Sequence, residues 1–149
     1  MAETLGSLCD KLTVVKLKQY HADDAQRLES LALQEKQIRD EIDSYILGAI
    51  SGEIQPEKLV FSSNKVYKRE GNETHEIMGS IGQVISDLAR ANCELWHEQE
   101  KVYEFEKVPM AEKDAVVKQL AKLNLIRTKC IDSIDSQFQQ FVMKQSAKP

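Results

Sequence analysis

The spacing of the apolar residues is the feature of this chain that most restricts its fold. Apolar side chains recur three or four positions apart, which places them along one side of an α-helix. Six glycines and three prolines are few for 149 residues, and the chain is rich in residues that favour helices. We therefore predict an all-α fold. The series are Leu5, Leu8, Leu12 and Val15; Ile81, Val84, Leu88 and Leu95; and Val116, Leu120, Leu123, Cys130, Ile134, Phe138 and Phe141.

Two interruptions divide the predicted helices. Val108-Pro109 separates the third helix from the fourth, because proline suits the start of a helix and disfavours helical structure in the residue before it. The helical period is also lost between Gly52 and Gly71. The segments "KLVF" and "KVYK" flank Ser62-Ser63-Asn64 there, which predicts an irregular linker or a short β-hairpin over residues 52–73. A mass of 17.0 kDa with 42% apolar residues predicts one domain over residues 1–149.

The second half of the chain echoes the first. "KQYHADD" (18–24) matches "ELWHEQE" (94–100), and a later pair of segments, 31–46 and 123–138, aligns with agreement at several positions. These matches predict a four-helix bundle built from two duplicated antiparallel hairpins over residues 3–50 and 74–142. The pairs are Tyr20 with Trp96, His21 with His97, Asp24 with Glu100, Asp40 with Asp132, Ile42 with Ile134, Asp43 with Asp135 and Ser44 with Ser136.

The repeated polar residues lie on a second face of each predicted helix. The simplest arrangement places each His-x-x-Asp/Glu pair near an Asp-x-x-Asp pair. Neutral imidazole with carboxylates can bind Zn, Mn or Fe, so a divalent metal is the cofactor that such a cluster would hold. One alternative is that these side chains are solvated or paired with Arg39, Arg127, Lys36 or Lys129, and another is that a histidine is buried at a dimer interface. The candidate metal ligands are His97, Glu100, Asp132, Asp135, His21, Asp24, Asp40 and Asp43.

Two metal chemistries could use this cluster. Glu94-Leu-Trp-His97 has the Glu-x-x-His spacing of di-iron bundles, but Lys18 stands at the matching position of the first half and cannot bind a metal. A symmetric di-iron site is therefore excluded. The other chemistry is Mg²⁺ held by paired acidic motifs, as in the all-α nucleotide pyrophosphohydrolases, which makes a metal-dependent hydrolase the alternative function. No catalytic residue is identified.

The composition and the charge and apolar patterns restrict which partners the chain can bind. A net charge of −4 and a pI near 5.5 argue against nucleic acid. The longest apolar run, residues 45–50, is far below the roughly 20 residues of a membrane helix, and the start of the chain does not resemble a signal peptide, so we expect a cytoplasmic protein. Cys9, Cys93 and Cys130 lack C-x-x-C spacing and are expected to be buried thiols. Each predicted helix has two semi-apolar faces, and together these faces present more apolar surface than one bundle can bury. This excess predicts a homodimer.

"LWHEQE" followed by "LNLIRTKCIDSID" resembles a bacterial all-helical domain family of unknown function. That family carries a Leu-Trp-His-x-Glu-Asp motif and a later Leu-Asn-x-x-Arg motif, and the resemblance covers mainly residues 81–138. Tyr103, Gln99 and Thr128 depart from its pattern, which has arginine, an acid and asparagine there. Such domains often occur beside glycosyltransferase genes, so the resemblance implies a link to surface-polysaccharide synthesis. We expect a non-catalytic binding or assembly protein.

Overall fold

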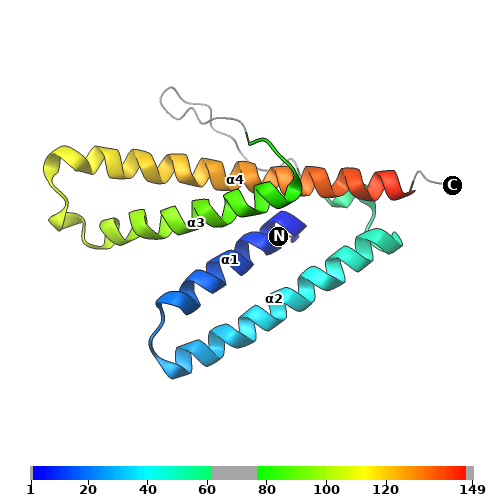
Figure 1. Ribbon diagram of the computed structural model, residues 1–149, viewed down its shortest axis with the longest axis horizontal. Helices are drawn as coiled ribbons and strands as arrows, with labels where there is room; N and C mark the ends of the chain where they lie inside the picture. The colour runs from blue at the N-terminus through cyan, green and yellow to red at the C-terminus, as the bar shows by residue number, and fades with distance from the viewer. Residues whose placement is uncertain (1, 62–76, 147–149) are drawn as a thin grey trace.

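The computed structural model of the protein describes residues 2–61 and 77–146 (Figure 1). Within these ranges the chain is helical and contains no strand, which confirms the predicted all-α, four-helix arrangement. The elements are α1 (Leu5–His21), α2 (Ala25–Ser51), the short 3₁₀ helix η1 (Pro56–Lys58), α3 (Ile81–Tyr103), a second 3₁₀ helix η2 (Phe105–Lys107) and α4 (Met110–Ser146).

Local sequence explains where these helices begin and end. The Thr4 side chain accepts from the backbone N–H of Ser7, and the Ser7 hydroxyl accepts from the backbone N–H of Thr4, which forms a reciprocal cap before α1. The Ser80 side chain caps α3 by accepting from the backbone N–H of Gln83. Gly52 ends α2 at a φ of 84°, a conformation that glycine adopts without strain. Pro109 immediately precedes α4, as predicted.

The four helices form two hairpins that are joined at one end of the molecule. Figure 1 shows α3 and α4 running side by side, with α1 and α2 forming a second hairpin that diverges from the first toward the α1–α2 turn. Helix α1 packs against both α3 and α4, whereas α2 packs mainly against α1. Helix α2 is therefore the flank of the bundle, and most of its surface is open to solvent.

The core lies where α1, α3 and α4 meet. Val84, Leu88, Cys130 and Ile134 are fully buried there, and Leu59 from the segment after η1 closes the end. Leu5, Leu8 and Val15 of α1 are also buried, so the predicted apolar stripes form the core-facing sides of α1, α3 and α4. Leu12, Ile81, Leu95 and Leu120 are only half-buried. Phe141 is 56% exposed and lies outside the core.

A buried polar network ties three helices together beside this core. Asp10 of α1 accepts from Arg127 of α4 at both carboxylate oxygens, with Nε–Oδ1 at 2.8 Å and Nη2–Oδ2 at 2.5 Å. Asn92 of α3 donates to Asp10 at 2.9 Å and to the Thr13 hydroxyl at 2.6 Å. A two-pronged ion pair of this kind has narrow geometric limits, so the network fixes the register of α1 on α3 and α4.

Several sequence predictions have mixed outcomes. Tyr20 is 85% exposed while Trp96 is half-buried, and Ile42 is half-buried while Ile134 is fully buried. These pairs do not occupy equivalent environments, so the duplication is not confirmed. The strands predicted around Ser62-Ser63-Asn64 fall largely outside the described residues. Of the three cysteines, only Cys130 is buried; Cys9 is half-buried and Cys93 is exposed, which corrects the expectation of three buried thiols.

Candidate functional site

The two histidine motifs meet in space through a ring stack. His21, the last residue of α1, lies parallel to the indole of Trp96 in α3, with ring centroids 4.6 Å apart and planes inclined by 8°. Tyr20 contacts the edge of His21 at 5.2 Å. Aromatic pairs of this geometry are stabilising contacts. The stack links the α1–α2 hairpin to α3 near the diverging ends.

Glu100 organises the polar side of this cluster. It accepts a hydrogen bond from Trp96 Nε1 at 3.0 Å, and its other oxygen lies 3.9 Å from His97 Nδ1. The side chains of His97 and Glu100 are 71% and 56% exposed. Surface contacts this exposed contribute little to stability, and both side chains are open to water.

The acidic residues of the first half have separate roles. Asp24 caps the N-terminus of α2 by accepting from Gln26 N–H at 3.1 Å. Asp40 pairs with Lys36 one turn earlier, with Lys36 Nζ and Asp40 Oδ2 2.8 Å apart. This pairing is the one expected if these side chains form ion pairs and hold no metal. Asp43 lies on the exposed side of α2.

Asp135 in α4 is the one buried member of the predicted set. It is 4% exposed and accepts from the backbone N–H of Gly6 at 2.7 Å. Burial raises its pKa to about 6, although the Gly6 hydrogen bond acts in the opposite direction. Asp132, one turn earlier, is half-buried and also raises this pKa. Asp135 therefore anchors the start of α1 to α4.

The antiparallel course of each hairpin keeps the histidine pairs away from the aspartate pairs. Asp40 lines the same groove as Glu3 and Leu8, at the start of α1, whereas His21 ends that helix. Gln137, next to Asp135 on α4, donates to the carbonyl of Gly79, before the start of α3, whereas His97 lies near the end of α3. In the described part of the chain, no group of three or more His, Cys, Asp or Glu side chains is placed to hold a metal ion.

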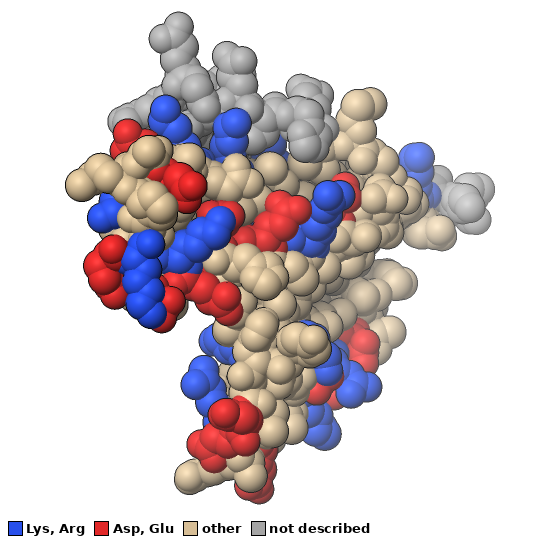
Figure 2. Space-filling model, turned by 60° about the vertical axis from the view of Figure 1, so that its left-hand side comes forward, with Lys and Arg blue, Asp and Glu red and all other residues tan. Residues whose placement is uncertain are grey.

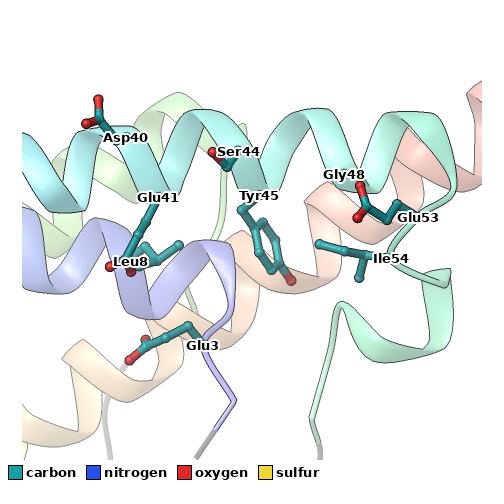
Figure 3. A pocket seen from close by; sticks show the side chains of 9 residues that line it. All are labelled: Glu3, Leu8, Asp40, Glu41, Ser44, Tyr45, Gly48, Glu53 and Ile54. Carbon is teal, nitrogen blue, oxygen red and sulfur yellow. The ribbon is translucent and has the colours of Figure 1, made fainter.

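A groove at the surface of the described residues lies between α1 and α2. Its volume is about 640 Å³, within the size range of small-molecule sites. Figure 3 shows Tyr45 projecting from α2 across it, with Glu3, Glu41 and Leu8 on one side and Glu53 and Ile54 on the other. The lining residues are Glu3, Leu8, Asp40, Glu41, Ser44, Tyr45, Gly48, Glu53 and Ile54.

Two partly buried titratable groups that pack against the core, Tyr45 and Cys9, are held in their neutral forms. Burial raises the pKa of the Tyr45 hydroxyl to about 12, with a further contribution from the Asp135 charge. Burial likewise raises the pKa of the Cys9 thiol to about 11, aided by Asp135 and Asp10. A thiol with a raised pKa is a poor nucleophile at neutral pH, so Cys9 is unsuited to nucleophilic catalysis.

Sequence reasoning missed the groove and the Asp10 network. Asp10 and Asn92 fall at core-facing positions of α1 and α3, and a polar residue at an apolar position is a signal that it has a buried partner. Glu41 and Glu53 gave no comparable signal, because an isolated glutamate on a helix or in a loop is usually solvated. Both belong to α2 and the segment after it, and the residues of α1 that complete the groove could not be predicted from them.

Comparisons with known proteins add no relative: a scan of protein-family models, a search of curated proteins and a search of solved structures each found no match. The resemblance to a bacterial helical family therefore stays an expectation from the motifs. None of the helices in the described ranges has the length and apolarity needed to cross a membrane. Fold and site together define a four-helix, two-hairpin protein with an acidic surface groove.

Proposed function

We propose that this chain is a non-catalytic assembly module that forms a homodimer through the exposed apolar residues of α2. The observation that carries the proposal is the one-sided packing of that helix. Of its 27 residues only Leu31, Gly48 and Ala49 are buried. A long helix covered on one side only leaves a second side available to a partner.

The exposed side of α2 carries three large aliphatic residues. Leu33, Leu47 and Ile50 are 59%, 68% and 64% exposed. At about 100° per residue, Leu33 and Leu47 lie roughly 40° apart around the helix, and Leu47 lies roughly 160° from the buried Leu31. The two leucines therefore share the side of α2 that faces away from α1.

Figure 1 shows that α2 and α4 finish at the same end of the molecule. Phe141 and Met143 of α4 are 56% and 52% exposed. Their distance from the diverging tips means that association here would leave the His21–Trp96 stack undisturbed. Clusters of exposed apolar residues are common at sites of association.

Surface charge favours a protein partner over nucleic acid. On the face shown in Figure 2, Lys and Arg side chains are mixed with Asp and Glu rather than gathered into a basic patch. The net charge of −4 adds no attraction to phosphate. A mixed surface of this kind suits a protein interface with a polar rim.

The metal-dependent hydrolase has no observation in its favour among the described residues, because the histidine and aspartate pairs lie apart. A cytoplasmic location, an origin by duplication and a link to surface-polysaccharide synthesis belong to the proposal on the strength of the sequence alone.

Sedimentation velocity on charge-introducing variants tests the proposed interface. Leu47→Glu/Ile50→Glu should convert the dimer to monomer, since two buried carboxylates would disfavour the interface. Met110→Glu is the matched control, because Met110 is 83% exposed at the opposite end of α4. A Leu47→Glu/Ile50→Glu protein that sediments as the wild type does would place any interface elsewhere.

A further inference from the structure

The outer side of α2, which the proposed dimer would use, carries a row of apolar, charged and polar side chains. At about 100° per residue, every member of the row lies within about 40° of the direction opposite the buried Leu31. All five are exposed, and α2 packs mainly against α1 on its other side. The row consists of Leu33, Lys36, Asp40, Ser44 and Leu47.

The two leucines of this row are placed symmetrically about Asp40. Leu33 precedes Asp40 by seven residues and Leu47 follows it by seven. A closed pair of identical chains uses the same surface twice, so each contact between two different residues occurs twice. An antiparallel pair of α2 helices centred on Asp40 therefore places Leu33 of each copy opposite Leu47 of the other, and both apolar contacts form together.

The charges on and beside the row distinguish an antiparallel pair from a parallel one. In a parallel pair each residue meets its own equivalent, so every charge faces a like charge, which is unfavourable. In the antiparallel pair centred on Asp40, three of the four charged residues face an uncharged polar residue of the other copy. The facing pairs are Glu29 with Ser51, Lys36 with Ser44 and Asp43 with Gln37.

Asp40 is the one charge that meets its own equivalent in both arrangements. Lys36 of the same copy already pairs with it, with Nζ and Oδ2 2.8 Å apart. In the antiparallel pair the lysines of the two copies lie one turn to either side of the two carboxylates and balance their charge. This arrangement also brings the N-terminus of each α2 near the C-terminus of the other, and these ends carry opposite partial charges.

We propose that two copies of the chain pair antiparallel along α2 about a two-fold axis at Asp40, with Leu33 of each copy against Leu47 of the other. This inference rests on the proposed homodimer and adds its orientation and register. Helix α2 begins at the α1–α2 turn (Figure 1), close to the stack of His21 on Trp96. Antiparallel pairing places the two turns at opposite ends of the dimer, whereas parallel pairing would place them side by side.

Mixing variants of opposite charge tests the orientation. Leu33→Glu and Leu47→Lys should each be monomeric alone, because each homodimer would hold two charges against leucine. Mixed in equal amounts they should form a heterodimer, since the two introduced charges face each other and the two remaining leucines do the same. Native mass spectrometry identifies the heterodimer by its mass, and sedimentation velocity measures its abundance.

Leu33→Glu mixed with Leu33→Lys is the matched control. The two introduced charges meet only in a parallel pair, so this mixture should remain monomeric. Both positions are exposed, and circular dichroism should show the wild-type helix content in all three variants.

Three results would overturn the antiparallel pair. A heterodimer from the control mixture and none from the first mixture would establish a parallel pair. A dimeric wild type whose two mixtures behave alike would rule out contact between Leu33 and Leu47, with the proposed homodimer still standing. A wild type that is monomeric at every concentration would remove the proposed homodimer itself, and its orientation with it.

Discussion

His21 of α1 stacks on Trp96 of α3, with ring centroids 4.6 Å apart and planes inclined by 8°. This contact joins the two echoing sequence motifs, and it does so by ring packing between a histidine of one motif and the tryptophan of the other. His97, the second histidine of the pair, is exposed and stacks on no described ring. The two motifs therefore share a sequence pattern while their histidines have different environments.

His21→Ala should lower the free energy of unfolding by about 1 kcal/mol, because it removes a stacked ring pair between the hairpins. It should also shift the fluorescence emission of Trp96, the single tryptophan of the chain, toward longer wavelength. His97→Ala is the control and should change neither quantity. Equal effects of the two substitutions would contradict the stack as a link between hairpins.

Gly6→Ala should destabilise the fold by about 2 kcal/mol or more. A Cβ at position 6 would lie 2.5 Å from the Ile131 carbonyl oxygen and 2.8 Å from Asp135 Oδ1. The clash involves backbone, so α1 would have to move away from α4 and weaken the Gly6–Asp135 hydrogen bond. Urea denaturation measures the loss.

Gly82→Ala provides the matched comparison. A Cβ there meets nothing within 4 Å, so the only effect is the higher helix propensity of alanine, which should stabilise by about 0.5 kcal/mol. If both variants changed stability by the same amount, close packing of α1 on α4 could not be the cause.

Asp135 should make stability fall as the pH rises. Its folded-state pKa is raised to about 6 from an ordinary value of 3.8, so the folded protein holds this proton more tightly than the unfolded chain does. The resulting stabilisation is fully present below the unfolded pKa and is lost as the pH rises through 6. Between pH 5 and pH 7 the loss should be about 1 kcal/mol.

Asp135→Asn isolates this contribution, since asparagine keeps an oxygen that can accept from Gly6 but does not titrate. The difference in unfolding free energy between wild type and Asp135→Asn should change across pH 5–7, whereas the exposed Asp114→Asn control should track the wild type. A pH-independent difference between wild type and Asp135→Asn would show that the carboxyl does not titrate in this range.

The main features of the fold could be predicted because they depend on local chemistry. The spacing of Val84 and Leu88 indicated the buried side of α3, and Val108-Pro109 indicated the break before α4. The flanking position of α2 could not be predicted, because the apolar residues of a helix do not show how many neighbouring helices cover it. Leu33 and Leu47 are exposed only because no other helix covers that side of α2.

The candidate site was less predictable than the fold. His97 and Asp132 belong to helices that pack together, so their chemistry suggested one cluster. How far apart they lie along α3 and α4 depends on where each helix begins. Helical spacing predicts the angle of a residue around its own helix axis, but it does not predict which residue of the neighbouring helix lies opposite. The burial of Asp135 likewise depends on Gly6, a residue remote in sequence that allows α1 to approach closely.

Divalent metal should leave the melting temperature unchanged. A site of ten-micromolar affinity at millimolar Mn²⁺ or Zn²⁺ would add about 2.7 kcal/mol by mass action and raise the melting point by several degrees. The described His and acidic side chains do not converge, so we expect no such rise. A rise that His97→Ala abolishes would instead establish a metal site there.

The molar mass of the wild-type protein in solution tests the proposed assembly most directly. Light scattering coupled to size exclusion, over a range of micromolar concentrations, should give twice the chain mass of 17.0 kDa, and Leu47→Glu/Ile50→Glu should give the chain mass itself. A wild-type mass of 17.0 kDa at every concentration would contradict assembly through α2.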